Sequence, residues 1–125
     1  MTNYIDGYVF PIERVHLDKY KKAADAIAKI WKEHGALAYF EYVSDDFKME
    51  GISSFSKLLR TSEDESVVFG WILFESQQVR DMAHEKVAAD SRMDDLVRPL
   101  MDPSNMIFDA QEMVYGGFAS LINVN

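Results

Sequence analysis

The chain of 125 residues is 48% hydrophobic and 27% charged, which is typical of one globular domain, here residues 1–125, and excludes a disordered chain. Its formal net charge of −8, spread along the sequence, repels phosphate groups, so we expect neither a nucleic-acid partner nor binding to an anionic membrane. The absence of cysteine excludes disulfides and thiolate metal sites, while the lack of a leader sequence and of any apolar run near the ~20 residues that cross a bilayer predicts a cytoplasmic protein.

The first two predicted elements are a strand over residues 4–10 and a helix over residues 13–34. Side chains alternate in character along the strand, which Pro11 closes. The next stretch carries apolar residues at helical spacing: Leu17, Tyr20, Ala24, Ile27 and Trp31. Gly35 is expected to end this helix, because glycine takes the left-handed conformation without steric cost.

A second strand is predicted over residues 36–43, and a polar, acidic stretch follows over residues 44–65. A structureless loop of that length is unusual inside a compact domain. We therefore expect a strand extension near residues 46–49 and a short helical or extended piece over residues 54–59, whose apolar side chains lie on the body of the protein.

The third predicted strand, residues 66–75, is the most informative stretch of the chain, because it is apolar throughout and bounded by charge. Alternation places Val67, Phe69, Trp71 and Leu73 on one face and Val68, Gly70, Ile72 and Phe74 on the other. Both faces of this strand must therefore be covered.

Ser76 is the expected N-cap of a helix over residues 77–89, and a short helix over residues 90–101 follows before the last strand, residues 112–124. The order β-α-β-β-α-β predicts a ferredoxin-like α+β fold, a four-stranded antiparallel sheet with strands one and three at its centre and two main helices on one face. Because the other face is also apolar, we expect a second copy of the sheet to cover it, which predicts a homodimer.

Four segments carry a family resemblance. They are residues 4–9 (Tyr-Ile-Asp-Gly-Tyr-Val), 31–37 (Trp-Lys-Glu-His-Gly-Ala-Leu), 67–72 (Val-Val-Phe-Gly-Trp-Ile) and 113–118 (Met-Val-Tyr-Gly-Gly-Phe). Together they resemble the YbaA-like bacterial family, a domain-of-unknown-function family within the dimeric α/β-barrel superfamily. The resemblance runs nearly from end to end; it implies the same ferredoxin-like dimer and implies no activity.

Asp6 is the first candidate for chemistry, because it is a carboxylate in the middle of a predicted central strand, where burial suits it to general-base work. The simpler interpretation is that Asp6 accepts a hydrogen bond from a neighbouring tyrosine or lies in water at the sheet rim. If Asp6 faces the helices, we expect Tyr8 beside it on the same face and Trp71 to pass next to it on the third strand.

The glycines on neighbouring strands, Gly7, Gly70 and the pair Gly116 and Gly117, predict a hollow in the sheet. That hollow is either the floor of a pocket or the place where a packed helix or a β-bulge approaches the backbone.

Three further polar residues are candidates for a ligand site. His34 ends the first helix, where the helix dipole favours a cation, His84 lies on the second helix and can face the sheet, and Arg92 can bind an anion. Tyr115 belongs to a set of aromatic residues that either line a ligand site or pack in the core. The histidine spacing fits no metal motif and there is no phosphate or dinucleotide fingerprint, so we expect neither a metal nor another cofactor.

Two hypotheses about function follow. In the first, the homodimer binds or converts a small molecule in a pocket between sheet and helices. The candidate lining of that pocket is Asp6, Tyr8, His34, Trp71, His84, Arg92 and Tyr115. In the second, the protein is a non-catalytic, stress-associated or interaction dimer without pocket chemistry. A tyrosine or histidine converging on a cavity beside Asp6 favours the first hypothesis, and a sheet face sealed by packing favours the second.

Overall fold

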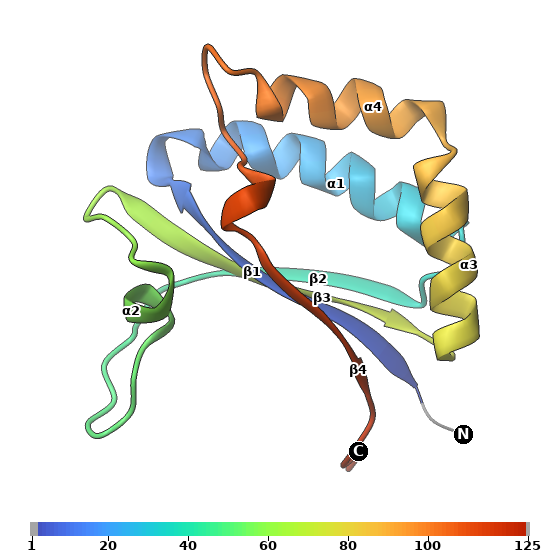
Figure 1. Ribbon diagram of the computed structural model, residues 1–125, viewed down its shortest axis with the longest axis horizontal. Helices are drawn as coiled ribbons and strands as arrows, with labels where there is room; N and C mark the ends of the chain where they lie inside the picture. The colour runs from blue at the N-terminus through green and yellow to red at the C-terminus, as the bar shows by residue number, and fades with distance from the viewer. Residues whose placement is uncertain (1–2, 125) are drawn as a thin grey trace.

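One four-stranded antiparallel sheet forms the centre of the computed structural model, which describes residues 3–124 (Figure 1). Its strands are β1 (Tyr4–Glu13), β2 (Ala38–Val43), β3 (Glu65–Phe74) and β4 (Val114–Ala119). Their order in space is β2-β3-β1-β4, so the first and third strands are central. This confirms the predicted ferredoxin-like α+β fold.

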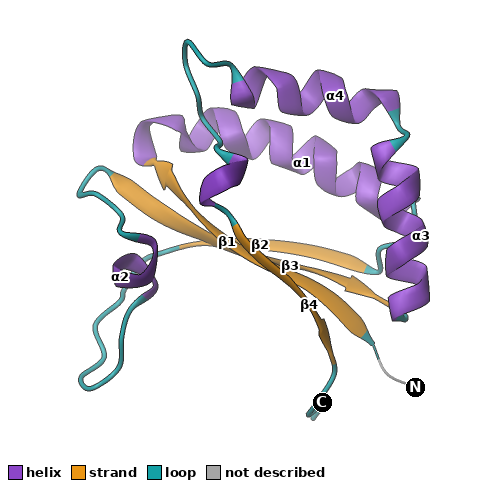
Figure 2. Cartoon of the chain, viewed as in Figure 1, coloured by secondary structure: helices purple, strands orange, loops and turns teal. Residues whose placement is uncertain are grey.

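The larger helices lie together on one side of the sheet (Figure 2). Helices α1 (Leu17–Glu33) and α3 (Gln77–Ala88) cover the sheet, and α4 (Ser91–Val97) packs against both of them. The short α2 (Phe55–Leu59) lies away from the other helices, between β2 and β3 in the chain, and its Phe55 ring is 5.6 Å from Phe69 on β3 (Figure 2). The chain also forms the 3-10 helices η1 (Arg14–His16), η2 (Arg98–Met101) and η3 (Ala110–Glu112). Within residues 3–124, no helix is long and apolar enough to cross a membrane.

The helix boundaries follow from local side chains, as predicted. The Ser76 hydroxyl accepts a hydrogen bond from the backbone N–H of Val79 at 3.1 Å and so caps α3. Ser54 caps α2 in the same way. Gly35 follows α1 with a φ of 122°, a backbone conformation in which a Cβ would be strained.

The first strand is longer than predicted, because it continues through Pro11 to Glu13. Pro11 pairs with Val67 on β3, whereas pairing of β1 with β4 ends at Val9. At Pro11, β1 therefore has a neighbouring strand on one side only, and a proline that cannot donate a hydrogen bond is tolerated there.

Two other predicted strand boundaries are wrong. Residues 46–49 form no strand, and the chain there runs out to α2 and back. The last strand ends at Ala119, although apolar side chains continue to alternate up to Val124. Ala119 pairs with Tyr4, the first residue of β1, so the residues after Ala119 have no further part of β1 to pair with.

Strand register divides the sheet into a helix face and an open face. Asp6 pairs with Ile72 on β3 and Gly117 on β4, and these residues point towards the helices. Phe10 and Phe74 share this helix face and are almost completely buried in the core. On each strand, the residues that alternate with these helix-face residues point to the opposite side of the sheet, which we call the open face.

The open face is aromatic and exposed. Five aromatic side chains lie on it: Phe40, Tyr42, Phe69, Trp71 and Phe118. The Trp71 ring stacks on Tyr42 at 5.6 Å and lies 5.2 Å from Phe40, while Phe118 is 55% exposed. A shallow hollow of about 470 Å³ extends between Trp71 and Phe118. The predicted apolar character of both sheet faces is thus observed.

Candidate functional site

Asp6 is a buried carboxylate at the centre of a polar cluster on the helix face. It is 2% exposed, and three side chains contact its two oxygen atoms. His84 Nε2 lies 2.5 Å from Oδ2, the Tyr115 hydroxyl donates to Oδ1 at 2.6 Å, and Arg80 Nη1 lies 3.4 Å from Oδ1. We call these four residues the Asp6 cluster.

Helix α3 positions two members of the cluster. Arg80 and His84 are four residues apart, so both point from the same side of the helix towards the sheet. Ala83, beside them, is completely buried and holds α3 close to β1 and β3. Tyr115 comes from the edge strand β4, level with Tyr8 on β1.

Arg80 ties the cluster to Tyr4. Its guanidinium donates hydrogen bonds to the hydroxyls of Tyr4 and Tyr115, each at 3.0 Å, and lies 4.7 Å from the centre of the Tyr4 ring. Burial, the largest single effect, lowers the pKa of Arg80, but Asp6 together with Tyr115, Tyr4 and Asp81 outweighs it, and the pKa is raised. Arg80 is therefore a fixed positive charge beside Asp6.

The contacts of Asp6 define which atoms remain available for chemistry. A carboxylate only accepts hydrogen bonds, so in the neutral form of His84 the proton shared with Asp6 lies on Nε2 and the lone pair lies on Nδ1. Within residues 3–124, the contact between Nε2 and Asp6 is the one hydrogen bond of the His84 ring. The His84 side chain is 37% exposed, and its ring lies 5.4 Å from that of Trp31 on α1. Asp6 therefore orients His84, and the histidine is the group that can exchange a proton.

Tyr115 is the second accessible member of the cluster. Burial, followed by the hydrogen bond to Asp6, raises the pKa of Tyr115 to about 12. Its hydroxyl thus stays protonated at neutral pH, and the residue is 50% exposed at the β4 edge of the sheet. Its one proton is donated to Asp6, so Tyr115 presents its phenol oxygen, beside His84, as a hydrogen-bond acceptor at this edge.

Comparison with known proteins gives the family of this chain. A family model described as "Protein of unknown function (DUF1428)" matches residues 3–110. The uncharacterized protein YbaA of Escherichia coli (strain K12) is 35% identical over 120 residues, which cover 96% of this chain and 97% of YbaA, and YbaA of Shigella flexneri matches equally well. The chain belongs to the DUF1428 family. The resemblance to the YbaA-like family predicted from the sequence is thereby confirmed.

Solved structures share the fold of this DUF1428 chain at low sequence identity. An uncharacterized NIPSNAP domain protein from Burkholderia xenovorans aligns with a TM-score of 0.57 at 8% identity, covering 98% of each chain. Rv0793 from Mycobacterium tuberculosis aligns with a TM-score of 0.56 at 12% identity, covering 98% of this chain and 99% of Rv0793. These likenesses establish the fold alone, so the function of the DUF1428 chain has to be argued from its own side chains.

The seven candidate pocket residues predicted from the sequence do not all lie together in the structure. Asp6, His84 and Tyr115 meet in the Asp6 cluster. Trp71 does not, because it pairs with Gly7 and so points to the open face, whereas the residue beside Asp6 is Ile72. Tyr8 is on the helix face as predicted, but its hydroxyl donates to Glu41 at 2.5 Å and not to Asp6.

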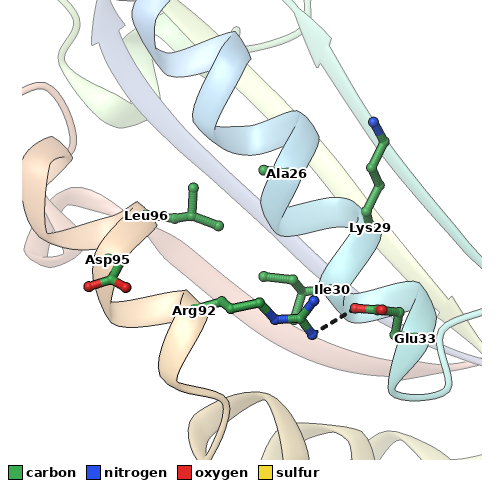
Figure 3. A pocket seen from close by; sticks show the side chains of 7 residues that line it. All are labelled: Ala26, Lys29, Ile30, Glu33, Arg92, Asp95 and Leu96. Atoms are coloured by element: carbon green, nitrogen blue, oxygen red, sulfur yellow. Dashed lines mark hydrogen bonds and ion pairs between the residues drawn. The ribbon is translucent and has the colours of Figure 1, made fainter.

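His34 and Arg92 meet away from the Asp6 cluster, where α1 ends and α4 begins. Both contact Asp90, the N-cap of α4, and Arg92 followed by His34 holds the pKa of that carboxyl well below its usual range. Arg92 also lies 2.7 Å from Glu33, at a groove of about 560 Å³ between α1 and α4 (Figure 3). These two residues join helices in this DUF1428 chain and do not line a pocket with Asp6.

The glycines do leave space in the sheet, and aromatic rings occupy it. A Cβ on Gly70 would lie 2.6 Å from the Tyr8 ring, and one on Gly117 would lie 2.5 Å from the Tyr4 hydroxyl. On the open face, a Cβ on Gly7 would lie 3.2 Å from the Phe118 ring. Neither a helix nor a bulge fills the space on the helix face, where tyrosine rings cover Gly70 and Gly117. Gly7 and Gly116 line the hollow on the open face, as the first interpretation predicted.

Sequence reasoning missed Arg80, Tyr4 and Glu41. The spacing of Arg80 four residues before His84 is a signal that both share one side of α3. Tyr39 lies two residues before Glu41 on the same face of β2, but no local signal joins Glu41 to Tyr8 on β1 or Tyr20 on α1. Among residues 3–124, no three His, Asp or Glu side chains come together as a group that can hold a metal ion.

Proposed function

We propose that this DUF1428 protein is a cytoplasmic homodimer that binds a small molecule at the Asp6 cluster and exchanges a proton with it through His84. The observation that carries the proposal is the buried Asp6 carboxylate, 2.5 Å from the Nε2 atom of a histidine that is itself partly exposed. A carboxylate that fixes one nitrogen of an imidazole directs the other nitrogen towards whatever enters from solvent.

The chemistry that this arrangement supports is general acid–base catalysis. Histidine is the side chain whose ordinary pKa lies nearest to neutral pH, so it both takes up and releases protons under physiological conditions. Tyr115, half-exposed beside it, donates its one hydroxyl proton to Asp6, so the phenol oxygen can accept a hydrogen bond from an N–H or O–H group of the bound molecule. Access is from the β4 edge, where Tyr115 lies.

Support for the homodimer comes from the open face. Trp71 and the four exposed aromatic residues around it form a contiguous apolar surface on the side of the sheet that α1, α3 and α4 leave uncovered. Surfaces of this kind mark association sites, and a two-fold pair of identical sheets covers both copies at once.

One observation favours a second candidate function, that of an interaction dimer without catalysis. His84 lines neither the hollow on the open face nor the groove between α1 and α4, and of the Asp6 cluster only Tyr115 borders the hollow. Side chains fill the layer between helices and sheet, as the burial of Phe10, Phe74 and Ala83 indicates. In this alternative, the Asp6 cluster only stabilises the packing of α3 on the sheet.

Incubation with a bacterial small-molecule extract, followed by mass spectrometry, tests the proposal. We expect the wild-type protein to bind or deplete at least one compound, and His84→Gln to lose this effect because glutamine cannot exchange the proton. His16→Gln is the matched control, since His16 lies outside the cluster beside Glu13. If the wild type and His84→Gln act on the same compounds equally, or neither acts on any, the interaction dimer becomes the better account.

A further inference from the structure

A second carboxylate on the helix face, Glu41, is surrounded by tyrosines. Tyr8 donates to its Oε2 atom at 2.5 Å, and Tyr39 donates to the same atom at 3.1 Å. Tyr20 on α1 lies 2.8 Å from Oε1 and 2.9 Å from Oε2. Three phenols from three elements thus converge on one carboxylate, which we call the Glu41 site.

The tyrosines stay protonated in every physiological condition. Burial is the first cause that raises the pKa of Tyr8, Tyr20 and Tyr39 above the ordinary value, and the negative charge of Glu41 raises each of them further. Their hydroxyls are permanent donors, so they hold the carboxylate in one orientation. They satisfy its hydrogen bonds and leave its charge unneutralised.

A positive partner is missing from the Glu41 site. Within residues 3–124, no Lys, Arg or His nitrogen lies at ion-pair distance from Glu41, whereas Asp6 has Arg80 and His84 beside it. A half-buried carboxylate without a cation is costly to maintain. The aromatic residues around it are the surroundings in which proteins bind organic cations.

One oxygen atom of Glu41 has hydrogen-bonding capacity left for the missing cation. Oε2 accepts hydrogen bonds from all three tyrosines, but Oε1 accepts only the one from Tyr20, so Oε1 has a lone pair to spare. Glu41 lies on β2, an edge strand, and is partly exposed to solvent. A ligand can therefore approach Oε1 from the β2 edge of the sheet, whereas Tyr115 lies at the β4 edge.

We propose that the Glu41 site binds the primary ammonium group of a small organic amine, which donates a hydrogen bond to Oε1 and supplies the missing positive charge. This binding is separate from the chemistry at the Asp6 cluster, because the two carboxylates lie on strands that β3 separates. Failure of one proposal leaves the other standing.

Titration with n-butylammonium chloride, followed by amide NMR shifts, tests the proposal. We expect saturable shifts of Tyr39 and Glu41 in the wild type, and affinity weaker by about tenfold or more in Glu41→Gln, the effect of losing one charge-assisted hydrogen bond. Neutral n-butanol and potassium chloride at equal ionic strength should leave these signals in place. Asp46→Asn, which removes an exposed acid from the loop after β2, is the charge-matched control.

A second variant keeps the test decisive if Glu41→Gln does not fold. Tyr20→Phe retains the carboxylate and frees Oε1 from its one donor, so we expect it to bind n-butylammonium more tightly than the wild type. Equal affinity of the wild type and Glu41→Gln would overturn the proposal. Weaker binding by Tyr20→Phe, or shifts confined to residues away from Glu41, would overturn it as well.

Discussion

At the scale of single residues, the buried charge of Asp6 is stabilised by the hydrogen-bond donors around it. His84, Tyr115 and Arg80 together engage both of its oxygen atoms. In Asp6→Asn the shape is kept, but an amide N–H meets groups that themselves donate, and Arg80, whose side chain is 14% exposed, keeps only Asp81 as an ion-pair partner within residues 3–124. We expect the free energy of unfolding to fall by about 3 kcal/mol in urea denaturation.

The control for this prediction is Asp46→Asn. Asp46 accepts a hydrogen bond from the backbone N–H of Lys48 in an exposed turn, so its replacement should change the free energy of unfolding by less than about 0.5 kcal/mol. Wild-type stability in Asp6→Asn would mean that the cluster does not need the carboxylate charge.

Tyr115 predicts how stability changes at alkaline pH. Its pKa is about 12 in the folded protein, against an ordinary value of 10.0, because of burial and the bond to Asp6. Below pH 10 both states hold the proton and its contribution is fully present. Between pH 10 and 12 the folded state holds more protons than the unfolded chain, so stability falls as pH rises. Urea midpoints measured across this interval should decline less steeply for Tyr115→Phe, and equal slopes would contradict the assignment.

The residue-level chemistry was only partly predictable from the sequence. Asp6 stood out because a carboxylate in an apolar strand needs partners, and His84 because its helix follows the central strand. The spacing of four residues places Arg80 on the same side of α3 as His84, but its contact with Asp6 depends on the packing angle of α3 on the sheet, which no local pattern encodes. The prediction that Trp71 lies beside Asp6 is wrong by one residue of register. Ile72 pairs with Asp6, and Trp71 therefore points to the other face of the sheet.

At the scale of elements, a glycine on one strand makes room for a tyrosine ring from the neighbouring strand. The Tyr8 ring crosses Gly70 on β3 to reach Glu41 on β2, so three strands are joined by one side chain. A Cβ at Gly70 would lie 2.6 Å from that ring, and the crowded, buried Tyr8 has little room to move. We expect Gly70→Ala to destabilise the protein by about 2 kcal/mol, the usual cost of overpacking.

Gly116→Ala is the comparison for this prediction. Its added carbon would lie 3.2 Å from the Phe118 ring, which is 55% exposed on the open face and can turn aside. Thermal unfolding of the two variants should therefore show the larger loss for Gly70→Ala. A larger loss for Gly116→Ala would mean that the Tyr8 crossing is not what requires glycine.

Helix ends that a single residue determines were predictable from the sequence. Strand ends that depend on pairing with a distant strand were not. Ser76 and Gly35 fix the start of α3 and the end of α1 by local hydrogen bonding and backbone conformation. The end of β4 depends instead on where β1 begins, more than a hundred residues earlier in the chain. Alternating apolar residues after Ala119 therefore suggested a strand for which no partner exists.

At the scale of the whole molecule, the exposed aromatic open face predicts self-association. Light scattering on the eluting protein should give twice the 14.4 kDa chain mass. Trp71→Glu places a charge among Phe40, Tyr42 and Phe69 and should yield the single chain mass without unfolding. Lys29→Glu, an exposed change on α1, should stay dimeric. A wild-type protein with the mass of a single chain would contradict the proposed homodimer.

The central claim is that buried Asp6 orients His84 so that Nδ1 is free to exchange a proton. Two-bond proton–nitrogen correlation in nitrogen-labelled protein measures directly which ring nitrogen carries the proton. The account predicts that neutral His84 is protonated on Nε2, the atom 2.5 Å from Asp6, and that Asp6→Asn weakens this preference. A neutral His84 protonated on Nδ1 in the wild type would contradict the claim, because the nitrogen that does not contact Asp6 would then have no lone pair.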